Sequence, residues 1–303
     1  MIEKVKRKMK TLKEFLKKGR YDKVFRHGYR NLVRLLINRG YNFRDQFSVL
    51  EEEWETLIIL DACRYDTFEA KNDLQGSLDS RYSRASRTYE WLERTFTEDE
   101  YEDIVYVSAN PHTQNAIDGE EIFHDVRNVF QTHWSDEYGT VMPDAVSKAA
   151  KELREEHPDK RLVVHYIQPH EPYIGDKKTY TGYLSPDSWQ RTLMDELAYG
   201  DGDPEEFYEA YTYNLLEALE SVEKLLPSLQ GDRVVISSDH GELFGEKKFY
   251  GHPADLAVEE LVKVPWFKVD MKPYEEEKNF NNVSEGDDAE IKEKLEALGY
   301  SSK

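Results

Sequence analysis

The stretch VVISSDHGELFGEKKFYGHP, residues 234–253, begins like a buried strand and ends among side chains that commonly bind metals. Its first three residues are apolar and β-branched, as is typical of a strand in the core of a parallel sheet. Two serines follow, and then Asp239, His240 and Glu242 come within four positions, with His252 a short loop later. Carboxylates and imidazoles together at the end of a core strand indicate either a metal site or a polar loop.

Apolar runs of the same kind recur along the chain. They are ETLIILDACRYD (55–66), EDIVYVSAN (102–110), KRLVVHYIQPHEPY (160–173) and LVKVPWFKV (261–269). Helical patterns lie between them, at residues 143–157 and 205–226. Strands that alternate with helices predict an α/β fold with a mostly parallel central sheet and helices on both faces.

Polar side chains follow three of these strands at the point where each strand ends. Asp61 follows the first strand, His170 follows the third, and Asp239 and His240 follow the run that begins at residue 234. In open α/β sheets, reactive groups gather beyond the carboxyl ends of the strands. The recurrence therefore favours a functional site over a polar loop.

Length and composition limit the class of protein. The chain has 303 residues, of which 34% are charged and 13% aromatic, so we expect a folded chain with a substantial core. Its single cysteine, Cys63, excludes an intrachain disulfide and fits a reducing compartment. No apolar run approaches the roughly 20 residues that span a bilayer, and the N-terminus lacks the apolar stretch of a signal peptide. We therefore expect a cytoplasmic protein.

The net charge of −20 is unevenly distributed along the chain. Residues 1–45 contain 15 lysines and arginines against 4 acidic residues, whereas the remainder contains 26 against 57. So acidic a body resembles that of halophile proteins, in which salt screens the repulsion between charges. It also argues against nucleic acid as a partner. The charge pattern divides the chain into a basic helical extension, 1–45, and an α/β domain, 46–303.

The basic extension has the periodicity of amphipathic helices. Apolar residues from Ile2 to Leu16 fall on one face of a first helix, and a second helical stretch spans roughly residues 21–38. Three interpretations remain open: a hairpin packed on the domain, contact with a neighbouring subunit, or residues 1–40 lying on an anionic membrane surface. The last would place the protein peripherally at the inner face of the membrane. The oligomeric state stays open.

The order of the motifs resembles that in sulfatase-like members of the alkaline phosphatase superfamily. The motifs are LDACRYD, HYIQPHEPY, SSDHGE and GHP, and IKEKLEALGY (291–300) resembles the C-terminal helix of sulfatase-type chains. The resemblance covers roughly residues 55–300. It implies an anionic ester substrate and one bound divalent metal, whether Mn, Mg, Zn or Ca, held by Asp61, Asp239 and His240. Such a metal neutralises the charge that develops on the reacting oxygens.

The resemblance also implies a nucleophile between the first strand and the second. The cysteine- or serine-containing Pro-Ser-Arg motif of formylglycine sulfatases is absent from RYSRASRTYEWLERTF (81–96), which favours phosphate esters over sulfate esters. Relatives that transfer phosphate use a threonine or serine here, and this residue also ligates the metal. Thr88 is the predicted nucleophile because a helix begins just after it, and the helix N-terminus would attract an anionic ester. Ser86 is the alternative.

His170 and His252 complete the predicted site. In relatives, histidines in these motifs contact the transferred group, help the leaving oxygen or bind a second metal. The helical stretch after residue 200 supplies no histidine, so we expect one metal per chain. Arg64, Arg87 and Ser86 are predicted to contact the anionic substrate.

The sequence thus predicts a metal-dependent hydrolase or transferase that acts on phosphate esters, in preference to sulfate esters, through a covalent threonine or serine intermediate. Whether water or another hydroxyl accepts the group stays open. The alternative is a catalytically silent relative that serves as a binding or membrane-surface scaffold. The intact set of site residues favours the enzyme, because an unused site has no physical reason to keep buried charges together.

Overall fold

A computed structural model of the chain describes residues 35–98, 100–175, 202–229 and 231–271, together with Tyr29, Leu32, Val33 and Leu197. These residues belong to one unit, Met1–Met271. Three features predicted from the sequence lie outside the described residues. They are the apolar stripe from Ile2 to Leu16, most of the surface proposed to contact a membrane, and the C-terminal helix at 291–300.

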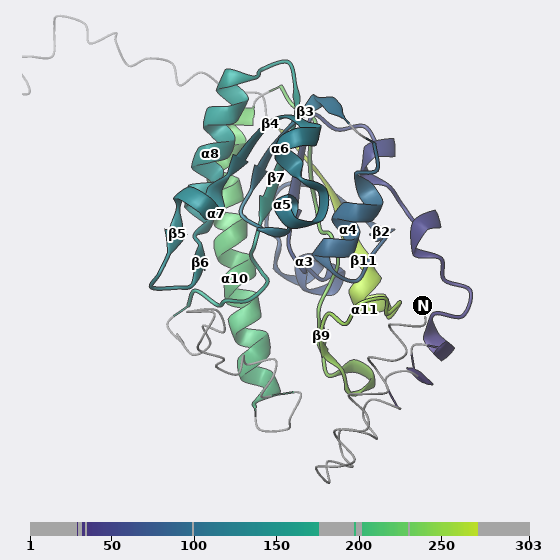
Figure 1. Ribbon diagram of the computed structural model, residues 1–303. Helices are drawn as coiled ribbons and strands as arrows, with labels where there is room; N and C mark the ends of the chain where they lie inside the picture. Colours follow the sequence, from purple (N-terminus) through teal and green to yellow (C-terminus); the bar gives the residue numbers. More distant parts are fainter. Residues whose placement is uncertain are drawn as a thin grey trace, which may run out of the picture. The chain divides into compact units, whose positions relative to one another are not determined.

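A seven-stranded sheet forms the centre of the described fold (Figure 1), in the order β2-β11-β8-β1-β7-β3-β4. Its strands are β1 Thr56–Leu60, β2 Gly76–Tyr82, β3 Tyr101–Ser108, β4 Phe123–Asn128, β7 Arg161–Tyr166, β8 Val234–Ser237 and β11 Lys263–Val269. The strands from β8 to β4 pair in parallel, whereas β11 is antiparallel to both β8 and β2. The predicted mostly parallel sheet is confirmed.

Two short antiparallel ladders lie outside the central sheet. One joins β5 Trp134–Ser135 to β6 Thr140–Val141, and the other joins β9 Leu243–Phe244 to β10 Tyr250–Gly251. Trp134 and Thr140 of the first ladder line the cavity described below, and the second ladder ends directly before His252.

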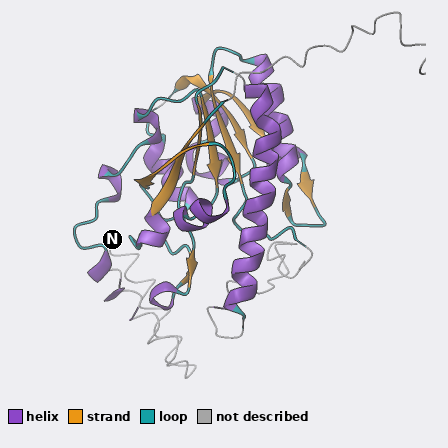
Figure 2. Ribbon diagram, turned by 180° about the vertical axis from the view of Figure 1, so that it is seen from behind, coloured by secondary structure: helices purple, strands orange, loops and turns teal. Residues whose placement is uncertain are grey.

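Helices cover both faces of the sheet (Figures 1 and 2). On one face lie α3 Tyr65–Lys71, α8 Pro143–Glu156 and α10 Pro204–Leu225, and on the other lie α4 Thr88–Thr95, α5 His112–Ile117 and α6 Gly119–Ile122. Shorter elements are α7 Val129–Thr132, α11 Glu259–Val262 and the 3-10 turns η1 Phe43–Asp45, η2 Val49–Glu51, η3 Leu226–Leu229 and η4 Glu246–Lys248.

The unbroken apolar run of β1 follows from its place between the two helical layers. Every residue of the strand is buried. Side chains alternate along a strand, so Ile58 and Leu60 pack in the cluster that includes α8 and α10, while Leu57 and Ile59 pack with Trp91 of α4. A strand covered on both faces keeps apolar residues on both, which is why the sequence shows a continuous run.

The two long helices begin with residues that favour a helix start. Pro143 and Pro204 each occupy the first turn, where the missing amide hydrogen costs no hydrogen bond. The Asp203 carboxylate also caps α10 by accepting from the backbone amide of Glu205 at 2.9 Å. The helices predicted at 143–157 and 205–226 are therefore found with nearly the predicted bounds.

Strands β2 and β4 are absent from the sequence-based prediction. Their sequences, GSLDSRY and FHDVRN, are largely polar and only partly buried. Both strands lie at the edges of the sheet, where one long side of the strand has no partner and polar side chains meet solvent. A run-based prediction detects buried strands and misses edges of this kind.

The described part of the basic extension packs on the α/β domain. Val33 and Phe43 are buried in a cluster with residues of 243–262. The side chain of Asn38 donates to the carbonyl oxygen of Asp255 at 2.6 Å and accepts from the amide of Ala257 at 2.9 Å. For these residues the first of the three interpretations applies, and the domain boundary at 45–46 stays a prediction.

Candidate active site

Asp61 and Asp239 lie side by side because they follow neighbouring parallel strands. Strand β1 pairs with β8, and each aspartate comes just after the end of its strand. The backbone amide of Ala62 donates to Oδ1 of Asp239 at 3.0 Å, and the amide of His240 donates to the same oxygen at 2.9 Å. Ala62 has a φ of 60°, so the chain turns sharply at this point.

The turn after Asp61 is held from behind by Tyr211 of α10. The phenol donates to the carbonyl oxygen of Ala62 at 2.7 Å and accepts from the amide of Arg64 at 2.9 Å. In the turn after Asp239, the backbone packs closely against the backbone of a distant segment. A Cβ on Gly241 would lie 2.1 Å from the carbonyl oxygen of Glu260, so only glycine allows this close approach of two backbones.

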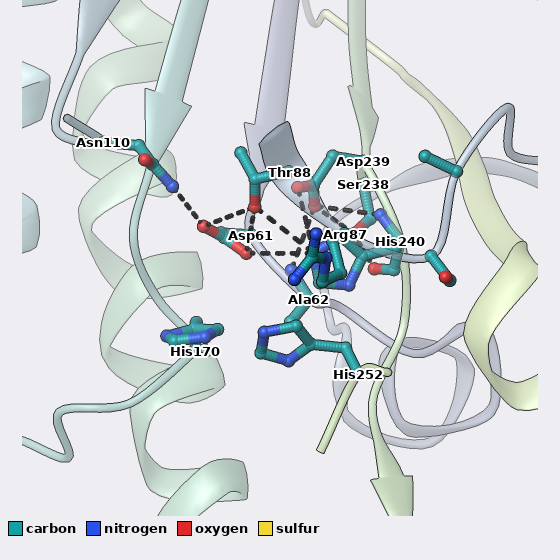
Figure 3. Close-up of polar contacts among 12 residues, drawn as sticks. Asp61, Ala62, Arg87, Thr88, Asn110, His170, Ser238, Asp239, His240 and His252 are labelled. Carbon is teal, nitrogen blue, oxygen red and sulfur yellow. Dashed lines mark hydrogen bonds and ion pairs between the residues drawn. The ribbon is translucent and has the colours of Figure 1, made fainter. Parts of the chain in front are cut away.

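Thr88 lies in the first turn of α4 and points at these groups (Figure 3). Its Oγ1 is 3.3 Å from each oxygen of the Asp61 carboxylate and 3.3 Å from Nε2 of His240. Asn110, just beyond β3, donates its amide to Oδ2 of Asp61 at 2.6 Å. Sequence analysis missed Asn110, although it ends the segment EDIVYVSAN and so also lies beyond the carboxyl end of a parallel strand.

Asp61, Asp239 and His240 form a first group of potential metal ligands. Each contributes one ligand atom, these atoms lie within 4.8 Å of one another, and all three residues are buried. Nδ1 of His240 lies 2.8 Å from the carbonyl oxygen of Gly241 and therefore carries the ring proton, which leaves the lone pair of Nε2 for a ligand.

The electrostatics of this first group fit a bound cation. Oδ2 of Asp239 is buried and makes no hydrogen bond. Burial and the nearby charge of Asp239 raise the pKa of Asp61 well above its ordinary value. Burial also lowers the pKa of His240. Two buried carboxylates beside a neutral imidazole are costly without a positive charge between them, and a divalent metal would supply it.

His170, Glu242 and His252 form a second group, whose ligand atoms also lie within 4.8 Å of one another. Nδ1 of His252 is 3.1 Å from the Glu242 carboxylate. The ring centroid of His252 is 4.8 Å from that of His170 and 4.9 Å from that of His240 (Figure 3). The prediction of one metal relied on the lack of histidine in the helical stretch after residue 200, and it stays a prediction. The second group is assembled from the GHP motif and two other motifs.

A cavity of about 620 Å³ opens beside Thr88. Asp61, Asn110, His170 and His252 line it together with the predicted substrate contact Arg87, whose guanidinium also pairs with Glu90. A single cavity is therefore lined by the candidate nucleophile, by Asp61 of the first group and by both histidines of the second group.

Two predicted substrate contacts, Arg64 and Ser86, do not line this cavity. The buried guanidinium of Arg64 donates to Asp66 at 2.8 Å, to Glu246 at 2.6 Å and to the carbonyl oxygen of Glu242 at 3.1 Å. Arg64 thus holds the chain around the second group, because neighbouring carboxylates and a carbonyl occupy its donors.

The hydroxyl of Ser86 is likewise occupied by the backbone. It donates to the carbonyl oxygen of Pro253 at 2.9 Å and accepts from the amide of Leu256 at 3.3 Å. These bonds tie the segment before α4 to the loop after His252. Of the two candidate nucleophiles, only Thr88 lines the cavity.

Neither a protein-family model nor a curated protein matches this chain. Solved structures do match. The soluble domain of lipooligosaccharide phosphoethanolamine transferase A from Neisseria meningitidis is 14% identical with a TM-score of 0.47, over 74% of this chain and 79% of that one. The C-terminal periplasmic domain of phosphoethanolamine transferase EptC from Campylobacter jejuni is 15% identical with a TM-score of 0.46, over 70% and 77%. A 2-O GAG sulfatase is 12% identical with a TM-score of 0.45, over 72% and 65%.

Other matching structures add the length and setting of these proteins. This chain covers 49% of the integral membrane phosphoethanolamine transferase EptA from Neisseria meningitidis, about half of its length. The matching EptC domain from Escherichia coli has a structure in complex with Zn. No helix in the described part of this chain is long and apolar enough to cross a membrane.

The comparison corrects one prediction. The cytoplasmic location expected from the sequence, with contact at the inner membrane face, is wrong, because the matching EptC structures are periplasmic domains. That expectation relied on the lack of an export signal or an apolar span, which is weak support for a location. In fold, the chain is similar to phosphoethanolamine transferases and a sulfatase, and its motifs resemble those of sulfatase-like members of the alkaline phosphatase superfamily.

Proposed function

We propose that the chain is a metal-dependent enzyme that transfers the phosphoryl group of an ester, in preference to a sulfuryl group, through a covalent bond to Thr88. The observation that carries the proposal is the place of the Thr88 hydroxyl. It lies 3.3 Å from both oxygens of Asp61 and from Nε2 of His240, and it lines the cavity.

Asp61, Asp239 and His240 would hold the metal, with the Thr88 oxygen beside them. A divalent metal held there supplies positive charge that acidifies the hydroxyl and neutralises the oxygens of the transferred group. Asn110 fixes the Asp61 carboxylate in the orientation that faces Thr88. The N-terminus of α4 adds a favourable field for the anionic ester.

The second group suits proton transfer to the leaving alcohol. In the proposed step, the Thr88 oxygen bonds to phosphorus while the bond from phosphorus to the alcohol oxygen breaks. Burial lowers the pKa of His252, but the charge and hydrogen bond of Glu242, together with the charges of Glu171 and Asp239, raise it above its ordinary value. The ring therefore keeps a proton to donate. Burial and the neighbouring His252 lower the pKa of His170 to about 4, so that ring stays neutral.

Water or an acceptor hydroxyl then attacks the phosphothreonine and releases the Thr88 oxygen, and His252 takes up the proton of the attacking group. Hydrolysis and transfer share every step up to this point. The same residues therefore serve either outcome, and the acceptor alone distinguishes a hydrolase from a transferase.

Replacement of the nucleophile tests the proposal. With 4-nitrophenyl phosphate as the probe and Mn²⁺, Mg²⁺ or Zn²⁺ added, Thr88→Ala should lower turnover by about 10³-fold or more. Thr88→Ser keeps a hydroxyl and should retain much of the activity, and Ser86→Ala should keep most of it. Mass spectrometry of acid-quenched protein should find the phosphate on residue 88. A phosphate on Ser86, or full turnover by Thr88→Ala, would contradict the assignment.

A further inference from the structure

The cavity beside Thr88 is larger than the reacting group requires. Its volume of about 620 Å³ falls in the roughly 300–1,000 Å³ range of pockets that enclose whole small-molecule ligands. Besides the polar groups named above, its lining contains a set of side chains with rings: Tyr89, Pro111, His112, Trp134 and Pro172. The site therefore offers a ring-lined surface to the part of the substrate that is not transferred.

Trp134 is the largest member of this ring-lined surface, and 41% of the residue is exposed. Exposed indole rings are uncommon in folded chains unless they contact a ligand or a partner, because their large apolar area favours burial. The exposed indole of Trp134 at the cavity thus favours a role in binding a ligand. A polar residue at the same position would meet water at no such cost.

The backbone of Trp134 is held in place by buried neighbours. It pairs with Val141 in the β5–β6 ladder, which lies beside α7 (Figure 1). Both residues of β6 are buried. The side-chain amide of Gln168 donates to the carbonyl oxygen of Val141 at 3.0 Å. Because Gln168 lies two residues before His170, the ladder that carries the indole is tied to the segment that carries a site histidine.

The five residues of the ring-lined surface carry little charge of their own, and Glu171, beside Pro172, is a carboxylate residue that also lines the cavity. Burial lowers the pKa of His112, so its ring is neutral, and its edge contacts the ring of Tyr89 with centroids 5.7 Å apart. The guanidinium of Arg87 pairs with Glu90. Neutral rings and an indole face favour a ligand part with a flat apolar face, such as an aryl ring or a sugar ring.

We propose that Trp134 forms a stacking subsite for a ring in the alcohol portion of the ester. The inference deepens the proposed function and rests on it, since the subsite shares its cavity with Thr88. The preference is for an aryl or sugar phosphate over a phosphate ester of a short, ring-free alcohol. Trp134 acts on binding of the leaving group and takes no part in bond breaking.

Turnover of matched esters tests the subsite. Phenyl phosphate, glucose 1-phosphate, ethyl phosphate and O-phosphoethanolamine would be compared in the wild-type protein, Trp134→Ala and Trp134→Phe. For at least one ring ester, Trp134→Ala should lower kcat/KM about tenfold, whereas Trp134→Phe should lose less and ethyl phosphate should change less than twofold. A fall in kcat/KM for phenyl phosphate would indicate an aryl ring, and a fall for glucose 1-phosphate would indicate a sugar ring. Tyr82→Ala is the control, because Tyr82 is 44% exposed and lies on β2, outside the cavity lining.

Two results would overturn the subsite. One is an unchanged kcat/KM for both ring esters in Trp134→Ala. The other is a fall confined to O-phosphoethanolamine, which would mean that the indole recognises an ammonium group instead of a ring.

Calorimetric binding of phenyl phosphate to the metal-loaded proteins separates this inference from the proposed function. If the wild-type protein turns over no ester, yet Trp134→Ala binds phenyl phosphate about tenfold more weakly, the subsite stands and the proposed function falls. If esters are turned over and phenyl phosphate and glucose 1-phosphate are handled equally by wild type and Trp134→Ala, the function stands and the subsite falls.

Discussion

Two groups of potential metal ligands meet beyond the carboxyl ends of the central strands, and different parts of the chain hold them. The first group, Asp61, Asp239 and His240, comes just after β1 and β8 and is fixed by strand pairing and by hydrogen bonds between the two turns. The second group, with Glu242 and His252, lies on the loop between β8 and α11 and includes His170 after β7. Strand pairing fixes the first group more rigidly than a loop can fix the second.

The loop that carries His252 depends on chain segments that are distant in sequence. Arg64 bonds to the carbonyl oxygen of Glu242, and Ser86 bonds to that of Pro253. Asn38 bonds to two backbone groups of 255–257. We therefore expect that metal retention and the precise placement of His252 can be changed separately.

The largest expected effect comes from the first group. Asp239→Ala should abolish turnover and metal retention, since it removes a predicted ligand whose buried Oδ2 makes no hydrogen bond. Cooperative thermal unfolding should persist, because the change also relieves repulsion between Asp239 and Asp61 in the metal-free protein. Elemental analysis of the purified protein measures the metal.

Asp125→Ala is the matched control for this experiment. Asp125, Glu156 and His157 also bring two carboxylates and an imidazole together, but Arg127 pairs with both carboxylates. This variant should keep the metal and the activity. Retained metal in Asp239→Ala, or its loss in Asp125→Ala, would show that the first group does not hold the ion.

A smaller effect is expected in the second group. Glu242→Gln keeps the size of the side chain and removes its charge, so activity should fall by about 10- to 100-fold, as for other groups that orient a site histidine. The carboxylate raises the pKa of His252, so protonated His252 persists to higher pH in the wild-type protein. The alkaline limb of the kcat–pH profile should therefore move to lower pH in the variant. An unmoved limb would exclude His252 as the proton donor.

The sequence predicts the residues of the site to different extents for a physical reason. Asp61, Asp239 and His240 directly follow apolar runs, so the rule for strand ends locates them without knowledge of the strand order. The same rule places Asn110 beyond the end of β3, but its contact with Asp61 depends on the strand order, because β3 is separated from β1 by β7. Such an arrangement is not encoded in any local pattern.

Two of the three predicted substrate contacts, Arg64 and Ser86, lie outside the cavity lining for a similar reason. An arginine near acidic residues can face a ligand or form ion pairs, and only the fold shows that Arg64 reaches Glu246 from a distant segment. Ser86 and Thr88 are two residues apart and both precede or begin α4, yet only Thr88 faces the cavity. The direction of each side chain is set by the backbone at the start of α4 and by the loop after His252, which bonds to Ser86.

The smallest effect is expected from the segment that supports the His252 loop. Asn38→Ala removes the two hydrogen bonds to residues 255–257, each worth about 1 kcal/mol net in a protein, and less where solvent reaches the group. We expect a loss of a few degrees in Tm and a severalfold fall in kcat. Metal retention should not change, because the first group is held by the sheet.

Asn42→Ala is the matched control for Asn38→Ala, because its side chain bonds only to nearby residues, accepting from Arg44 at 3.2 Å and donating to Asp45 at 2.6 Å. It should lose similar stability and keep kcat, since it does not contact the His252 loop. Equal kcat in the two variants would show that this segment only stabilises the fold. Metal loss in Asn38→Ala would show that the two groups are not held independently. The loss of a hydrogen bond to Asp255, 217 residues away in sequence, would then also have disturbed the metal ligands that follow β1 and β8.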